Sequence, residues 1–387
     1  MRSLKILSFS FFFVFLGAGS LQPYLNPYLK ETCNLSFLQT SLILTLVYLM
    51  MGITRFFVGY LVSIFGLYFS LIFGAITYSL FVIVMGYCTM FFPFLLFASL
   101  LWGMGAALFW TGSESHILNT TPVEKYGAAI GTLRLFTHLG LIAGFFLLGQ
   151  ALLNYGYSGL FYLATGATAL GSLAVLFIAK ENISYPKLHL KRIFELMRAL
   201  KLISLSLFVA GFAYGIILNL LNFFVKDNFG MRMLNRTLIF YYFSAGIFSL
   251  LGGFISDRIG RSITFTFAFL AGTLGLAVLF LFKNIWGVFL CSFLLGMQFG
   301  TILTVAAAWL GDMVASEERP TALGLLFSWA SLGVAFSIIL SGLLSQGGIP
   351  FDKVLLTFAA IFFLLFLLSA FQSTSSKKSL VELIDKG

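Results

Sequence analysis

Residues 253–261 read GFISDRIGR and join two long apolar runs, 233–256 and 262–282. Three of these nine residues are charged, in a chain that is 60% hydrophobic and only 9% charged. A soluble domain carries roughly 25% charged residues because its surface faces water. Here 23 basic and 13 acidic side chains cannot cover a soluble particle of 387 residues. Most of the surface must therefore face lipid, and 253–261 is predicted to be a short polar loop between two membrane-spanning helices.

Working outward from this loop, the chain contains twelve apolar runs of about the length that crosses a bilayer. The runs are continuously apolar and lack the two-residue alternation of barrel strands. The first resembles a secretory signal as far as Ser20, but it continues to Leu29, so we expect it to be retained as a helix. The sequence thus predicts an all-α membrane protein with twelve transmembrane helices. The runs are 5–29, 36–62, 67–89, 92–117, 127–151, 156–179, 201–225, 233–256, 262–282, 285–311, 320–345 and 350–372.

A polar interruption near the chain midpoint divides the runs into two sets of six. Residues 124–131 align with 317–324 at an offset of 193, and Gly59 and Gly66 fall on Gly253 and Gly260 at an offset of 194. These matches indicate two pseudo-symmetric six-helix bundles, here called the first and second halves. The predicted domains are an N-terminal bundle (1–179), a cytoplasmic central loop (180–200), a C-terminal bundle (201–372) and a cytoplasmic tail (373–387).

The net charge of +10 follows this topology. Of the Lys and Arg residues in loops and termini, fifteen fall on the side of the chain ends and six on the other side. By the positive-inside rule both termini are cytoplasmic. We expect a monomer with many passes through the cell's inner membrane and no nucleic-acid partner. The three cysteines, Cys33, Cys88 and Cys291, form no metal or redox pattern and are expected to be free thiols, although Cys33 and Cys88 lie near the same face.

Segment 253–261 fits the pattern glycine-x-x-(Ser/Ala)-Asp-Arg-x-Gly-Arg, which resembles the loop signature of the major facilitator superfamily. Its place between the eighth and ninth runs matches the family, and the spacing of Asp312 and Arg319 resembles the family's acid-x6-Arg pair. The resemblance covers essentially the whole chain. It implies two bundles that rock about a solute site between them. It also implies a gating set whose charges lock one conformation: Gly253, Asp257, Arg258, Gly260, Arg261, Asp312 and Arg319.

The first half departs from both patterns. Its loop keeps Gly59 and Gly66 as gating glycines, but Ser63 and Ile64 stand where the acid and arginine are expected. The equivalent acid-x6-Arg positions hold Asn119 and Tyr126. We therefore predict a one-sided charge lock. Arg55 is expected near the membrane surface, in a structural role.

Charge inside the bilayer is costly, so each ionisable residue there is a functional candidate. Arg134 and His138 lie one turn apart, on the face opposite Gly140 and Gly144. Arg134 suits either an anionic solute or the carboxylate of Glu114, and His138 can carry a proton. Trp110 and Glu114 share a stripe that reads equally as a packing seam or a cavity wall.

The resemblance also implies a cavity lined by the first, fourth, seventh and tenth helices. It makes neutral polar and aromatic residues on or near these helices candidate solute contacts: Gln22, Asn26, Tyr214, Asn219, Asn222, Gln298 and Trp329.

The predicted function is secondary active transport of a small solute by alternating access, driven by a proton gradient through Glu114, His138 or Asp312. Glycines in 131–149 resemble an antiporter motif, with Phe145 in place of its proline, and give a mild preference for export. An uptake symporter or facilitator for a small organic anion, using Arg134, is the alternative. A non-transporting receptor or scaffold is the alternative of another class. We expect no enzyme, cofactor or metal, because no nucleophile–base spacing, metal-ligand cluster or phosphate-binding loop appears.

Overall fold

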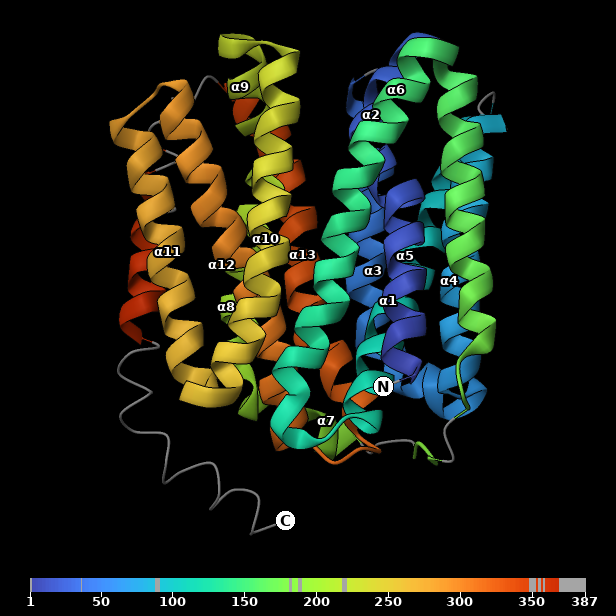
Figure 1. Ribbon diagram of the computed structural model, residues 1–387, viewed down its shortest axis with the longest axis vertical. Coiled ribbons are helices and arrows are strands. Elements are labelled where there is room, and N and C mark those ends of the chain that lie inside the picture. Colours follow the sequence, from blue (N-terminus) through green and yellow to red (C-terminus); the bar gives the residue numbers. More distant parts are fainter. Residues whose placement is uncertain are drawn as a thin grey trace.

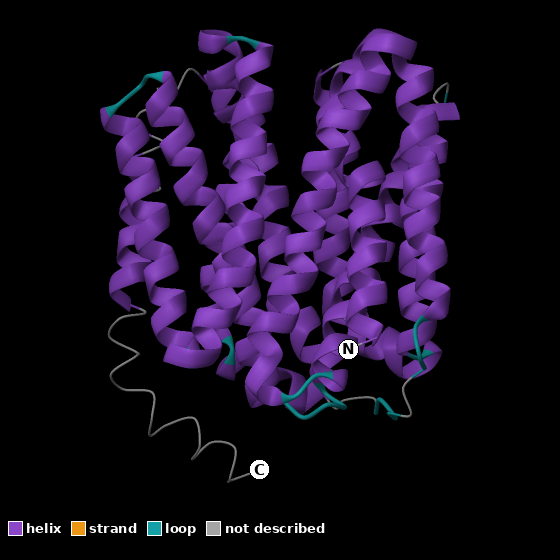
Figure 2. Cartoon of the chain, in the orientation of Figure 1, coloured by secondary structure: helices purple, strands orange, loops and turns teal. Residues whose placement is uncertain are grey.

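The computed structural model describes residues 2–35, 37–87, 91–180, 183–186, 190–217, 221–347, 353, 356–357 and 359–368. Within these ranges the chain is helical apart from short loops, and no strand occurs (Figure 2). Nearly every helix is apolar on all sides, as expected where lipid replaces water around a bundle.

The first half contains six α-helices joined by short turns (Figure 1). The first two are continuous through a π-helical turn at Phe15–Gly19. The helices are α1 (Arg2–Val14), α2 (Ser20–Cys33), α3 (Phe37–Phe65), α4 (Leu67–Tyr87), α5 (Phe92–Thr120) and α6 (Tyr126–Ala174).

The rest of the chain forms a short helix and then the second half. The helices are α7 (Leu190–Ala199), α8 (Lys201–Ile216), α9 (Asn222–Phe229), α10 (Met231–Ile259), α11 (Arg261–Leu281), α12 (Ile285–Met313) and α13 (Arg319–Gly347), with a further apolar helical stretch at Ala359–Leu368.

Nine helical segments in the described residues are long and apolar enough to cross a membrane, or ten if the bent pair of α7 and α8 counts as one. One of the nine contains α6, which leaves helical geometry at Gly156 with a φ of 65°. Its two arms run in opposite directions on either side of this turn (Figure 1). The fold class is thus an all-α membrane protein, while the number twelve stays a prediction.

The two halves lie side by side and meet along two helix pairs, α6 with α10 and α3 with α13 (Figure 1). Glycines permit both approaches. A Cβ on Gly131 would lie 2.4 Å from the carbonyl oxygen of Ser249, and one on Gly324 would lie 2.3 Å from that of Arg55. Small residues at such seams let helix backbones touch in a membrane, where no hydrophobic force drives them together.

Helix α7 lies inside the segment that we predicted to be a loop, 180–200. Leu196 and Leu200 are buried, while Lys191 and Arg192 on the other face are exposed. The helix is therefore amphipathic and lies at the lower end of Figure 1, in contact with α13. High charge alone had suggested an irregular loop, but four buried or half-buried apolar positions at helical spacing specify a surface helix.

Candidate functional site

Three ionisable side chains are buried together where the halves meet. Arg55 on α3, Glu114 on α5 and Arg134 on α6 are 7%, 1% and 5% exposed. We call these three residues the charge cluster. All three come from the first half, and both arginines reach toward Phe327 on α13 of the second half.

Arg134 forms an ion pair with Glu114 through Nη2 and Oε1. Its guanidinium carbon lies 5.2 Å from the ring of Trp110 and 5.5 Å from the ring of Phe327. Aromatic faces stabilise a buried cation in this way. Arg134 was predicted to bind either an anionic solute or the carboxylate of Glu114, and the structure contains the pair with Glu114. Trp110 lines the charge cluster. The Nε of Arg134 has no hydrogen-bond partner in the part of the chain described.

Arg55 does not extend to the membrane surface, so the expectation of a surface arginine is wrong. Its Nη1 donates to the carbonyl oxygen of Phe327 at 3.0 Å and to Oγ of Ser331 at 2.7 Å. Its guanidinium carbon lies 5.6 Å from the ring of Phe327. Arg55 therefore connects α3 to α13, across the boundary between the halves. The signal that marks it in the sequence is its charge within an apolar run.

The charge cluster holds two guanidinium groups and one carboxylate. Among the described residues Arg55 hydrogen-bonds only neutral groups, and Glu114, which also attracts it, is paired with Arg134. The three residues together therefore carry one excess positive charge. A buried charge is normally paired, coordinated or functional. The charge cluster carries this excess positive charge at the seam between the two halves.

His138 faces α10 of the second half but does not contact Glu114. Its Nδ1 is 2.6 Å from the carbonyl oxygen of Arg134, and its ring centroid is 6.0 Å from that of Tyr242. A Cβ on Gly246 of α10 would lie 3.0 Å from the Cβ of His138. The histidine thus lies at the seam one turn from the charge cluster, with one ring nitrogen held by backbone.

A set of hydroxyl groups occupies the seam beyond His138. The hydroxyl of Tyr48 donates to Oε1 of Gln22 at 3.3 Å, and Tyr48 also hydrogen-bonds Tyr214. The hydroxyls of Tyr214 and Tyr242 are 2.9 Å apart. Two of the predicted solute contacts, Gln22 and Tyr214, are therefore joined through a tyrosine that sequence reasoning missed.

Two other predicted contacts lie elsewhere. Gln298 is 1% exposed and faces α11, because a Cβ on Gly272 would lie 3.0 Å from its Cγ. It points into the second half, and its role as a solute contact stays a prediction. Trp329 packs against Phe56 and Phe208 at centroid distances of 6.3 and 6.4 Å, on a different face of α13 from Phe327.

Some predicted residues lie outside the described part of the chain. These are Asn219, Cys88 and the side chains of Asn26 and Asn222. Cys291 is a free thiol.

The signature loop, residues 253–261, lies between α10 and α11 and contacts the first half at the lower end of Figure 1. The carboxylate of Asp257 accepts hydrogen bonds from the backbone amides of Gly127 at 3.0 Å and Ala128 at 2.9 Å. These amides belong to the first turn of α6, where no intrahelical partner exists and the helix dipole favours an anion. Arg261 forms ion pairs with both Asp257 and Asp312, the second at 2.8 Å.

Arg319 also binds across the halves, and its side-chain partners there are Asn119 and Tyr126 of the first half. Its Nη1 donates to Oδ1 of Asn119 at 2.8 Å, and its Nη2 donates to the hydroxyl of Tyr126 at 2.7 Å. Asn119 and Tyr126 stand at the first-half positions equivalent to Asp312 and Arg319. The residues that replaced the missing charges are thus the partners of the remaining arginine.

Arg258 lies outside this network. It is exposed, and no ion pair or hydrogen bond of its side chain occurs within the described residues, so its part in the lock stays a prediction. Gly59 is at the seam, where a Cβ would lie 1.8 Å from Oγ1 of Thr321. Ser63, in the position of the missing acid, donates to the carbonyl of Tyr60 in its own helix instead. Gly66 has a φ of 82° and open space around it.

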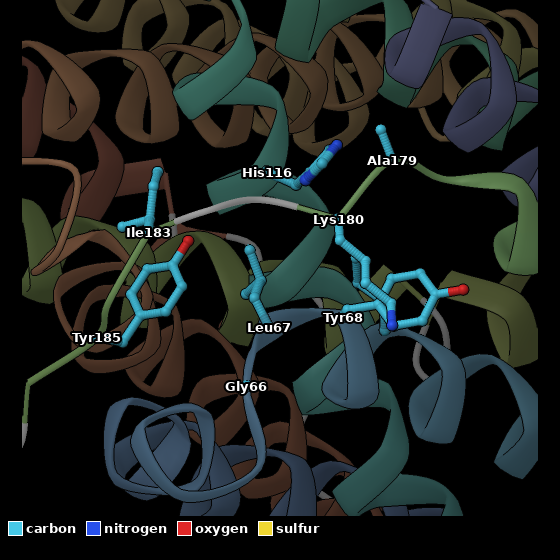
Figure 3. A pocket seen from close by; sticks show the side chains of 9 residues that line it. Gly66, Leu67, Tyr68, His116, Ala179, Lys180, Ile183 and Tyr185 are labelled. Carbon is cyan, nitrogen blue, oxygen red and sulfur yellow. The ribbon is translucent and has the colours of Figure 1, made fainter.

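A cavity of about 140 Å³ lies in the first half, and no residue of the charge cluster lines it (Figure 3). The turn between α3 and α4, the end of α5 and the segment after α6 line it. Lys180 lies 5.0 Å from the ring of Tyr68 there. Tyr185 accepts a hydrogen bond from Asn119 at 3.0 Å, which connects this segment to the Arg319 contacts.

Comparison with known proteins places this geometry in a family. A curated relative, the "Cis,cis-muconate transport protein" of Acinetobacter baylyi, is 22% identical over 342 residues, which cover 83% of this chain and 82% of the relative. The solved structure of the human organic anion transporter MFSD10 (TETRAN) superposes with a TM-score of 0.77 at 12% identity, over 95% of this chain and 99% of that one. The family model of the Major Facilitator Superfamily matches residues 7–240 and 203–383. With its signature loop, its two related halves and this match over nearly its full length, the chain belongs to the major facilitator superfamily, and it is a multi-pass membrane transporter of a small solute rather than an enzyme.

Proposed function

We propose that this protein is a proton-coupled secondary transporter of small organic anions, acting as a monomer in the cell's inner membrane. The observation that carries the proposal is the unbalanced positive charge of the charge cluster at the seam between the halves. A guanidinium group matches a carboxylate with two parallel hydrogen bonds, and the low dielectric of the seam strengthens the attraction.

The names of two similar proteins support an anionic solute. The bacterial relative is named for the transport of cis,cis-muconate, a dicarboxylate, and the human structure is named an organic anion transporter. The anion alternative therefore has more support than export of an unspecified drug-like solute.

Contacts between the halves support the proposal of alternating access. Asp257, Arg319 and Gly253 join the halves at one end, and these contacts must separate before a solute can pass there. This end carries the predicted cytoplasmic loops. The contacts are those of a conformation closed on the cytoplasmic side.

The glycine pattern that favoured export is explained by packing. A Cβ on Gly140 would lie 2.2 Å from the carbonyl oxygen of Phe12, and one on Gly144 would lie 2.4 Å from that of Leu16. These glycines bring α6 against the first helix, whatever the direction of transport. The direction of transport is therefore measured in liposomes.

Glu114 is the residue proposed to carry the proton. It is the acid of the charge cluster, and an anion that attracts Arg134 leaves Glu114 to take up a proton instead of a partner. The other two candidates for carrying the proton are engaged elsewhere. One ring nitrogen of His138 is held by the backbone, and Asp312 is bound to Arg261 at the lower end of the molecule.

The test is transport by purified protein in liposomes of phosphatidylethanolamine and phosphatidylglycerol, with labelled cis,cis-muconate and a proton-sensitive dye inside. We expect exchange of the dicarboxylate, competition by other short carboxylates, and none by a lipophilic cation. Arg134→Gln should abolish exchange, while Glu317→Gln, at an exposed acid, should leave it intact. Transport of the cation but of no carboxylate would contradict the proposal.

A further inference from the structure

We infer that the charge of the anion decides whether a proton moves with it: a dianion is carried together with one proton held on Glu114, and a monoanion is carried without one. This inference rests on the proposed function, because it takes the charge cluster as the anion site. It adds a rule for coupling that follows from counting charges at one buried position.

The geometry provides two separate cationic groups for the anion. The guanidinium carbons of Arg55 and Arg134 lie 5.6 and 5.5 Å from the centroid of the same ring, that of Phe327. The two groups are also close enough to interact electrostatically, and each has an Nε donor without a partner among the described residues.

A monoanion balances the charge cluster without any change in protonation. With Glu114 ionised and paired to Arg134, the cluster carries one excess positive charge, which belongs to Arg55. One carboxylate at Arg55 brings the sum to zero. Rocking the halves then moves no uncompensated charge through the low-dielectric seam, where such a charge is costly.

A dianion leaves one negative charge too many unless Glu114 changes state. Two carboxylates, together with the carboxylate of Glu114, face two guanidinium groups. Proton uptake by Glu114 neutralises its carboxylate, releases Arg134 from the ion pair and gives each substrate carboxylate one guanidinium. The loaded seam is again neutral, and one proton has entered with the substrate.

The neighbours of Glu114 offer no competing acid in the described residues. Helix α3 contributes Arg55, α6 contributes Arg134 with His138 one turn further, and α4 contributes Tyr78, which contacts Trp110 and interacts with Arg55. From α1 and the π-helical turn come Phe11 and Phe15, packed on Trp110 at 4.8 and 5.3 Å. From α13 come Phe327 and Ser331, both neutral.

The experiment compares the dicarboxylate of the transport assay with its monomethyl ester, which has nearly the same shape and one charge fewer. Both are tested in the same proteoliposomes near neutral pH, where each free carboxyl group is ionised. Net substrate uptake into vesicles without internal substrate is measured together with proton flux, because one-for-one exchange would carry each proton back. We expect one more proton per molecule for the dicarboxylate than for the ester, and a dependence on pH for the dicarboxylate alone.

Glu114→Gln removes the titrating group and fixes two positive charges. In this variant we expect exchange of the dicarboxylate to persist without proton movement, and its affinity to lose its dependence on pH. The affinity for the dicarboxylate relative to the ester should rise about tenfold or more, because the second charge now meets an unpaired guanidinium. Glu124→Gln, at an exposed glutamate, is the matched control and should behave as wild type.

The outcomes separate the inference from the function on which it rests. Equal proton counts for the two substrates, or an unchanged preference in Glu114→Gln, would overturn the coupling rule while anion transport still stands. If neither carboxylate is exchanged and neither raises the melting temperature of the wild-type protein, the proposed function fails and the rule fails with it. The melting temperature of Glu114→Gln itself shows whether that variant is folded.

Discussion

At the residue scale, Arg55 is the side chain that makes the charge cluster positive. Its hydrogen bonds end on the backbone and hydroxyl of α13, so it serves packing in the closed conformation and carries charge at the same time. These roles separate in substitutions. Glutamine keeps hydrogen-bond donors without charge, while lysine keeps the charge without the planar fork.

We predict that Arg55→Gln lowers transport of the dicarboxylate at least about tenfold, because a charge-assisted hydrogen bond contributes about 1.5–3 kcal/mol. Arg55→Lys should retain part of the activity. Initial rates in proteoliposomes measure both effects. Equal losses in the two variants would show that the geometry of the bonds to α13, and not the charge, is what matters.

At the element scale, the first turn of α6 and the last turn of α10 are in direct backbone contact. Asp257 caps the free amides of α6, and Gly253 lets the two helices touch, since a Cβ there would lie 2.1 Å from the carbonyl oxygen of Gly127. The first half has no acid equivalent to Asp257. Ser63 stands in that position and donates a hydrogen bond within its own helix. The acid at the closed end therefore comes from the signature loop of the second half, and Arg319 on α13 adds the contacts to Asn119 and Tyr126.

We predict that Gly253→Val prevents closure at this end. Val58 on α3 is a suitable reporter because it is fully buried and a Cβ on Gly324 of α13 would lie 3.4 Å from its Cβ. In a background without native cysteines, Val58→Cys should react several-fold faster with a small maleimide when Gly253→Val is present.

The matched control for this prediction is Gly66→Ala. Gly66 has a φ of 82° but nothing within 4 Å, so alanine there adds backbone strain of about 1 kcal/mol without forcing helices apart. Labelling of the reporter should stay at the wild-type rate. Equal labelling in all three proteins would contradict the role assigned to the contact between Gly127 and Gly253.

At the scale of the whole molecule, the two halves and the loops at their ends define an orientation. The end that carries α7 and the signature loop is also the end with more Lys and Arg (Figure 1). Because basic loops are retained in the cytoplasm, this end should face inward. Exposed lysines at both ends allow a direct test.

We predict that single cysteines at Lys125 and Lys191 react with a membrane-impermeant maleimide only after the cells are permeabilised. Cysteines at Lys30 and Lys283 should react in intact cells. All four positions are exposed, so differences in labelling report the side of the membrane. The reverse pattern would overturn the assignment of both termini to the cytoplasm. The closed end would then lie on the outer side of the membrane.

The sequence alone determined the class of fold, the family and the position of the signature loop. These depend on features local to the chain: the length of an apolar run, the glycines of a short turn and a repeat offset near half the length. Tertiary structure decided which side chains meet. In helices that are apolar on nearly all sides, periodicity does not reveal which face meets which neighbour, so the inward turn of Arg55, the attachment of Arg319 to Asn119 and the burial of Gln298 inside the second half could not be predicted. The pair of Glu114 and Arg134 was foreseen as an alternative because charge in a membrane requires a partner, whereas its unbalanced neighbour became apparent only when α3 was packed against α13.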